Sequence, residues 1–161
     1  MHVSSDLLHV GARVAGHASL QDIRTFRIHA DFAAFPTADV PLSWEIDENL
    51  SANVDDEPTF VIDGEYEVRI FQELEDDGGN RKDIAEVSLN VGALYELPDG
   101  ETGAGTYEEA EVAAFTHTTA RLALYPYVRA LVADMTVRLG LPGLLLPTMR
   151  VQIAAPAETS D

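Results

Sequence analysis

The sequence predicts a single α+β domain, built on an antiparallel β-sheet of about four strands and a long helix in its C-terminal half. Two observations lead to this prediction. The first two thirds of the chain contain runs in which apolar and polar residues alternate, and the last third contains an apolar stripe with helical spacing. With 161 residues and 46% hydrophobic content, the chain is long enough to bury one core.

Two alternating segments open the strand-rich part of the chain. Residues 25–32 carry apolar side chains at every second position and predict a half-buried strand, which Pro36 and Pro41 bring to an end. Residues 42–46 alternate over a shorter stretch, and we interpret them either as an extended connection with its apolar side chains on one side or as a strand of the core. Before both, residues 7–18 predict a short amphipathic helix that two glycines weaken.

The next prediction is a β-hairpin. Residues 60–74 and 84–97 both alternate apolar and polar side chains, and residues 76–80 between them have the Asp- and Gly-rich composition of a turn. We therefore expect the two strands to pair through a longer loop. Residues 98–100, Pro-Asp-Gly, end the second strand.

Two helices are expected in the last third of the chain. Residues 106–109, Thr-Tyr-Glu-Glu, match a capping box and predict a helix that reaches about Phe115 or further. A second helix is predicted over 124–139, where apolar residues recur at i, i+3, i+4, i+7 and i+11. Its stripe consists of Val128, Leu131, Val132, Met135 and Leu139. Gly140 is typical of the left-handed residue that follows a helix, and Pro126 either opens this helix or kinks a longer one.

The charge of the chain is strongly negative and unevenly placed. The formal net charge is −18, and 22 of the 28 acidic residues lie between positions 39 and 111, beside three basic residues. This charge argues against nucleic-acid binding, which needs a basic surface. The acidic residues either attract a basic partner or a basic unfolded chain, or they serve only solubility.

Cysteine is absent, which removes disulfides, thiolate zinc sites and cysteine nucleophiles and fits a cytoplasmic protein. No apolar run approaches the ~18 residues that a membrane span needs, and the first residues lack the basic start of a signal peptide. We expect one domain over residues 1–161, with flexible ends at 1–6 and 154–161.

Catalytic and metal-binding patterns are weak. The histidines include no pair at i, i+4 spacing, and neither a nucleotide-binding glycine loop nor a serine-hydrolase motif occurs. Residues 75–80 have calcium-like composition without the ligand spacing of an EF-hand loop, which favours a solvated turn. We therefore expect no enzyme activity, no cofactor and no metal site.

Several apolar residues lie in short or proline-interrupted segments outside the best predicted strands and helices. Such side chains either fill a core or line a groove in which adaptable side chains repack around many polypeptide sequences. The candidates for polypeptide binding are Leu42, Trp44, Ile46, Leu141, Leu144, Leu145, Leu146 and Met149.

The predicted second helix carries a more specific motif. It consists of Leu124, Tyr125, Pro126, Tyr127, Arg129, Arg138 and Gly140, with Pro142 and Pro147 beyond the helix. This order resembles the SecB family of export chaperones. Residues 10–13, Val-Gly-Ala-Arg, and 22–24, Asp-Ile-Arg, are similar to the SecB-like chaperones that accompany toxin–antitoxin systems.

The resemblance implies an antiparallel sheet, a long helix and a tetramer assembled as a dimer of dimers. It also implies an ATP-independent holdase that keeps unfolded polypeptides in apolar channels. Two client programmes are open: delivery of preproteins to the SecA motor for export, or protection of an antitoxin, which the N-terminal patch and short tail favour. The alternative is an interaction subunit that binds one folded partner through the same apolar surface.

A wide apolar stripe can be covered by symmetric association of subunits. The residues expected at the subunit interface are Tyr125, Tyr127, Val128, Leu131, Val132, Met135 and Leu139. The sequence departs from the SecB family after Pro147, where Thr148 and Met149 replace the usual Asn-Phe. Because few residues follow, we expect the lid-like second helix of the export chaperones to be truncated or absent.

Overall fold

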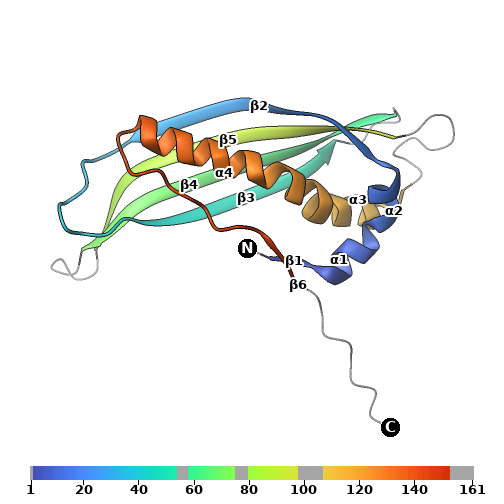
Figure 1. Ribbon diagram of the computed structural model, residues 1–161, viewed down its shortest axis with the longest axis horizontal. Coiled ribbons are helices and arrows are strands. Elements are labelled where there is room, and N and C mark those ends of the chain that lie inside the picture. The colour runs from blue at the N-terminus through green and yellow to red at the C-terminus, as the bar shows by residue number, and fades with distance from the viewer. Residues whose placement is uncertain (1, 54–57, 75–79, 98–106, 153–161) are drawn as a thin grey trace, which may run out of the picture.

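A computed structural model describes residues 2–53, 58–74, 80–97 and 107–152 (Figure 1). The elements follow in the order β1 (His2–Ser4), α1 (Ser5–Val10), α2 (Ala12–His17), β2 (Ser19–Phe32), β3 (Ser43–Asn53), β4 (Thr59–Leu74), β5 (Asn80–Glu96), α3 (Glu109–Phe115), η3 (Thr116–Ala120), α4 (Arg121–Arg138) and β6 (Arg150–Gln152). The predicted class is confirmed: a four-stranded antiparallel sheet lies against a long helix.

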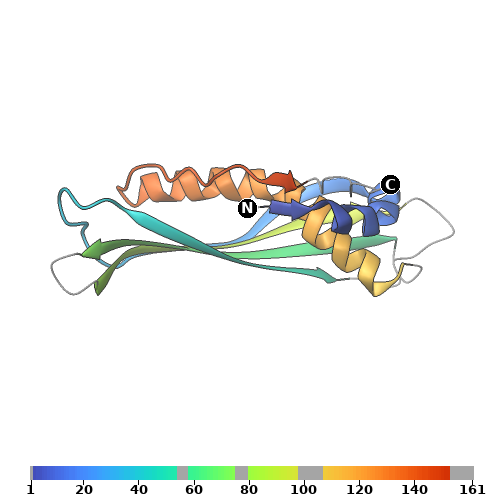
Figure 2. The ribbon, with the colours of Figure 1, turned by 90° about the horizontal axis from the view of Figure 1, so that it is seen from below.

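The main sheet has the strand order β2-β5-β4-β3, with every neighbouring pair antiparallel. The predicted hairpin, β4 and β5, supplies the two central strands, and the turn expected at residues 76–80 falls mostly outside the described residues. Figure 2 shows that the helices cover one face of this sheet. The two central strands are buried on the helix-covered face, where Tyr66 pairs with Leu89 and Val68 pairs with Val87.

The strand predicted at residues 25–32 is longer than expected, because β2 begins at Ser19. Its pairing with β5 shifts register between Thr25 and Arg27, so Phe26 lies at an irregularity. A Cβ placed on Gly92 of β5 would lie 2.3 Å from the Phe26 ring. A side chain at position 92 would therefore displace the exposed Phe26 ring from the place it occupies over the glycine.

The short segment at residues 42–46 belongs to a full strand. β3 continues to Asn53 and pairs with β4 from Ser43 onward. One of its inward positions is Glu48, which forms an ion pair with Arg121 of α4 and interrupts the apolar alternation that Leu50 resumes. Trp44 and Ile46 lie on the helix-covered side, opposite Ile70 and Val68.

The two helices expected in the last third form one continuous helical stretch, from α3 through the π-helical turn η3 into α4. The capping box exists but lies two residues later than expected, with Glu108 as N-cap and the Glu111 carboxylate accepting from the Glu108 backbone N–H at 2.9 Å. Pro126 lies inside α4, so it does not open this helix.

The predicted N-terminal helix is split into α1 and α2 at Gly11. A Cβ at this position would lie 2.7 Å from the backbone nitrogen of Phe115. The glycine therefore allows the N-terminal helices to approach α3 at backbone contact distance, a packing reason that the local pattern does not reveal.

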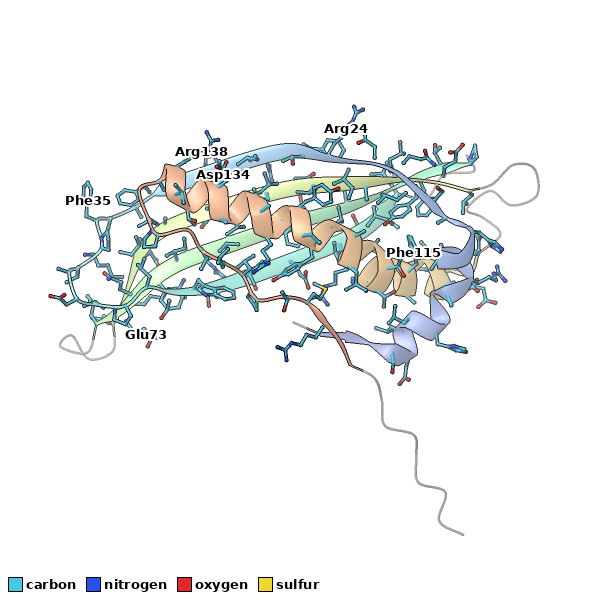
Figure 3. All side chains as sticks on the ribbon, in the orientation of Figure 1. Arg24, Phe35, Glu73, Phe115, Asp134 and Arg138 are labelled. Carbon is cyan, nitrogen blue, oxygen red and sulfur yellow. The ribbon has the colours of Figure 1, made fainter. Side chains whose placement is uncertain are left out.

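The core lies between the sheet and the helical layer. At one end, Phe115 packs edge-on against Tyr95 with ring centroids 5.0 Å apart, and Phe60 stacks on Tyr95 at 5.5 Å (Figure 3). Along α4, Val128 and Val132 are fully buried against the sheet. The inner half of the apolar stripe is therefore filled by the chain's own sheet.

A Schellman motif ends α4 as predicted. Gly140 has φ +78°, its N–H donates to the Val137 carbonyl at 2.9 Å, and the Leu141 N–H donates to the Thr136 carbonyl at 3.0 Å. The chain then runs back beside α4 without regular structure (Figure 1). We call residues 141–149 the strap.

The chain ends are joined by a small second sheet, in which β6 after the strap pairs in parallel with β1. Residues 2–6, expected to be flexible, therefore lie in β1 and the first turn of α1. Residues 154–161 fall outside the described part of the chain. Between α4 and Gln152 the described residues contain no helix.

Candidate functional site

An apolar groove of about 510 Å³ opens at the end of the sheet where β2 and β3 are connected. Its first wall is the loop between these strands, and its second wall is the start of the strap. The floor comes from β3 and β4. The lining side chains carry no charge and are Pro36, Thr37, Val40, Leu42, Ser43, Trp44, Ile70, Gln72, Leu141, Pro142, Leu144 and Leu145, with Gly143 contributing backbone.

The strap wall is attached to α4 by three side chains of that helix. The Thr136 hydroxyl accepts from the Leu144 N–H at 2.9 Å, Arg129 donates to the Leu146 carbonyl at 2.6 Å, and the Tyr125 hydroxyl donates to the Pro147 carbonyl at 2.7 Å. These contacts satisfy backbone groups of a segment that has no secondary structure of its own. Tyr125 and Arg129, two residues of the sequence motif, thus hold the strap.

Apolar anchors complete the attachment of the strap. Leu146 is 0% exposed and Leu141 is 6% exposed, whereas Leu145 between them is 69% exposed. The alternation places Leu145 and the half-buried Leu144 where the groove is open. The strap therefore presents apolar surface outward while its own position is fixed from below.

The loop wall is held by Gln72 of β4, which is fully buried. Its side-chain amide bonds to the backbone of Thr37 and Val40 at distances of 2.7–3.0 Å. Just before this wall, the exposed Phe35 ring packs edge-on against Phe32 at 5.3 Å, and Figure 3 shows Phe35 projecting from the loop.

The structure brings five of the eight predicted polypeptide-binding residues into the groove: Leu42, Trp44, Leu141, Leu144 and Leu145. Ile46 and Met149 do not line it and pack partly buried against the core. Leu146 is a core residue with no exposed surface and does not line the groove.

The predicted interface residues divide in the same way. Val128, Val132 and Tyr125 are buried within the single chain. Leu131, Met135 and Leu139 are half-buried, and Tyr127 is 52% exposed. The stripe is wide enough that its inner part meets the sheet, while its outer part keeps exposed surface.

Sequence reasoning missed the loop residues and Gln72. Gln72 falls at an inward position of the β4 alternation, in step with Val68 and Ile70. A polar residue at such a position requires hydrogen-bond partners, and this is the signal that could have identified it. The partners themselves lie 32 and 35 residues away along the chain and follow only from the fold.

The uncovered face of the sheet is rich in acidic residues that surround a few arginines. Arg69 forms ion pairs with Glu45, Asp47 and Glu67, with Nε 3.3 Å from Glu45 and 3.4 Å from Glu67. Arg81 bonds to Glu45 at 2.5 Å. The acidic excess of the sequence is thus partly placed on a flat surface opposite the helices.

On the helix-covered face, some polar groups are partly or fully buried. Arg121 of α4 forms an ion pair with Glu48 of β3, and burial lowers the pKa of Arg121. Burial also raises the pKa of Tyr66 to about 12. In the described part of the chain the Tyr66 hydroxyl has no hydrogen-bond partner.

No group of three or more His, Asp or Glu side chains that could hold a metal ion is found in the described ranges. The calcium-like residues 75–79 lie outside them. None of the described helices is long and apolar enough to cross a membrane.

The fold and the groove together are those of an α+β binding protein, in which two irregular segments form the walls of an open apolar site. No family model matches the chain. The SecB-like chaperone Rv1957 of Mycobacterium tuberculosis strain H37Rv is 36% identical over 154 residues, covering 88% of this chain and 82% of that protein. SecB-like chaperone MT2006 of strain CDC 1551 is 35% identical over the same extent.

A solved structure gives the same result. Rv1957 in complex with a ChAD peptide from the antitoxin Rv1956 HigA1 matches with a TM-score of 0.75 and 33% sequence identity, covering 88% of this chain and 98% of that one. The chain belongs to the SecB-like chaperones.

Proposed function

We propose that this chaperone is an ATP-independent holdase of the cytoplasm that binds an exposed segment of an antitoxin in the groove between the loop and the strap. The observation that carries the proposal is the uncharged apolar groove in a chain similar to a chaperone whose solved complex contains an antitoxin peptide. Preprotein delivery to SecA is the second client programme, and the comparisons give it no support.

The groove suits an extended apolar segment for two reasons. Its exposed lining is aliphatic and aromatic, so burial against a client contributes roughly 25 cal/mol per Å² of apolar surface. Its walls are attached to the fold from behind, by Gln72 on one side and Thr136 on the other, so a client meets a shaped surface. A groove without charged lining residues does not select for charge and tolerates varied sequences.

The test uses Leu145, which is exposed on the strap wall and has no role in the core. Leu145→Asp places a charge in the groove without removing a buried contact. We expect the affinity for a reduced and alkylated, permanently unfolded α-lactalbumin and for a synthetic ChAD peptide of HigA1 to fall about tenfold or more.

Leu7→Asp is the matched control, because Leu7 is an exposed leucine of α1 and does not line the groove. It should bind both probes as the unchanged protein does. If Leu145→Asp binds normally, the groove is not the binding site. Binding of folded α-lactalbumin but not of the unfolded form would favour the alternative, an interaction subunit for a folded partner.

We also propose that the subunits associate as a tetramer through the outer side of α4 and the free edge of β2. This edge strand exposes Phe26, Ile28 and Phe32. The helix α4 exposes Tyr127, which precedes the buried Val128 in the sequence. Exposed apolar side chains beside an unpaired strand edge favour association. Light scattering should give about four times the 17.5 kDa chain mass, and Ile28→Glu should lower it.

A further inference from the structure

We propose that Gln72 is the positioning residue of the groove: its buried side-chain amide latches the loop wall in the shape that a client binds. This inference rests on the proposed function of the groove. It concerns a residue that touches the loop backbone and acts on the client through that loop.

Both the oxygen and the nitrogen of the Gln72 side-chain amide take part in the latch. The carbonyl oxygen of Gln72 accepts from the Thr37 N–H at 2.7 Å, and its NH₂ group donates to the carbonyls of Thr37 at 3.0 Å and Val40 at 2.7 Å. The pair of bonds to Thr37 is the pattern that a neighbouring strand would make with that residue. One side chain thus replaces a strand partner for a loop that has left the sheet.

Backbone hydrogen bonds from Ala33 and Ala34 to the Ile84 carbonyl attach the start of the loop, and the part beyond them needs a partner of its own. Residues 33–42 contain no regular element, and between the two latched residues lies a turn with Asp39 at φ +63°. A left-handed conformation is unfavourable for a non-glycine residue and persists when the surroundings determine it. Gln72 bonds to both ends of this turn, at Thr37 and at Val40.

A second side chain reaches the same loop residue. Lys82, the single lysine of the sequence, pairs with Gln72 across the β4–β5 ladder and donates from Nζ to the Thr37 hydroxyl at 3.0 Å. Lys82 is only half-buried, so its bond is exposed to water, whereas Gln72 is fully buried. The amide is therefore the principal attachment and the ammonium group supports it.

The latch controls two lining positions directly. Thr37 and Val40 belong to the groove wall, and Gln72 itself lines the groove floor beneath them. Without the amide, the loop samples many conformations in the free protein, and a client must order it on binding. Ordering a flexible segment costs free energy, and this cost weakens binding. A loop wall that is already ordered in the free protein avoids the cost.

The test variant is Gln72→Met, which keeps the length and volume of the side chain and removes all three hydrogen bonds. In the free protein we expect hydrogen exchange of the Thr37 amide to accelerate at least tenfold, and quenching of Trp44, the single tryptophan, by acrylamide to increase. Affinity for unfolded α-lactalbumin should fall about tenfold.

Thr118→Val is the control for a general loss of stability. Thr118 is also fully buried and polar, but it donates to the Ala114 carbonyl within the helical stretch and does not line the groove. It should leave Thr37 exchange, Trp44 quenching and client affinity unchanged, whatever stability the loss of its hydroxyl removes. Normal Thr37 protection or normal affinity in Gln72→Met overturns the latch.

Gln72→Glu is the second variant, because it keeps the acceptor for the Thr37 N–H and loses both donated bonds. It should change the same three measurements in the same direction. If neither variant folds, Gln72 determines the fold and not the groove, and the proposal is overturned. If the unchanged protein does not bind unfolded α-lactalbumin, the proposed function fails, while Thr37 exchange still tests the latch.

Discussion

Replacing Thr136 with valine should release the strap from α4. The Thr136 side chain is fully buried, and its hydroxyl is shared as a donor between the carbonyls of Val132 at 3.0 Å and Ala133 at 3.1 Å. It accepts from the Leu144 N–H at 2.9 Å. Valine has nearly the same shape, so no cavity is opened. The variant therefore isolates the hydroxyl group.

The size of the stability loss follows from what each hydrogen-bond partner of the Thr136 hydroxyl loses. The Val132 carbonyl is also an acceptor within the helix, so loss of the hydroxyl there has little effect. The Leu144 N–H is half-buried and would lack an acceptor, which costs about 1–3 kcal/mol. We expect the free energy of unfolding to fall by about 1–2 kcal/mol, or the Tm by about 2–8 °C.

Urea unfolding measures the stability, and hydrogen exchange at the Leu144 amide locates the effect. Thr136→Ser is the matched control, because it keeps the hydroxyl and loses one methyl group, at a cost of about 1 kcal/mol. Leu144 should exchange faster in the valine variant and normally in the serine variant. Equal protection of the Leu144 amide in both variants would refute the idea that this hydroxyl holds the groove wall.

Three further results are expected. Tyr66→Phe should raise stability by about 1 kcal/mol at pH 7, because it removes a buried hydroxyl without a partner in the described residues. Burial raises the pKa of folded Tyr66 from 10.0 to about 12, so the folded state retains a proton that the unfolded state loses. Stability should therefore fall as pH rises from about 10 to 12, by on the order of 2 kcal/mol, and this part of the loss should vanish in Tyr66→Phe when urea unfolding is followed against pH. Trp44 emission should shift to the blue when unfolded α-lactalbumin binds and stay unchanged with the folded protein; no shift despite binding would place the client away from the β3 floor. Association with a basic unfolded client should slow in stopped flow as salt rises from about 50 to 500 mM, because the acids around Arg69 lie on an exposed face; rates independent of salt would leave only solubility for this charge.

The sequence predicted the central hairpin and the helix stop at Gly140 because both depend on local chemistry. Strict alternation fixes which side of a strand is buried, and a glycine after an apolar stripe favours the left-handed cap. The resemblance carried by the motif around Tyr125 was confirmed by the SecB-like relatives. The structure adds a physical reason for two motif residues, since Tyr125 and Arg129 hold the strap by hydrogen bonds to its carbonyls.

The sequence alone misplaced the limits of elements that depend on contacts with distant residues. β3 extends to Asn53 although Glu48 interrupts its apolar alternation, because pairing with β4 supplies stabilisation and Arg121 of α4 forms an ion pair with Glu48. The split at Gly11 likewise depends on the backbone of Phe115, which lies more than 100 residues away. Contacts of this kind leave no local pattern for a sequence to reveal.

The apolar side chains of the site were set by the sequence, but their division between core and groove was decided by the tertiary structure. Leu145 and Leu146 are chemically identical neighbours, yet one is 69% exposed and the other is fully buried. What separates them is the path of the strap, fixed by hydrogen bonds from α4 to its backbone. The loop wall is decided in the same way by Gln72, because hydrogen bonds between distant segments form only after the sheet and helix have brought those segments together.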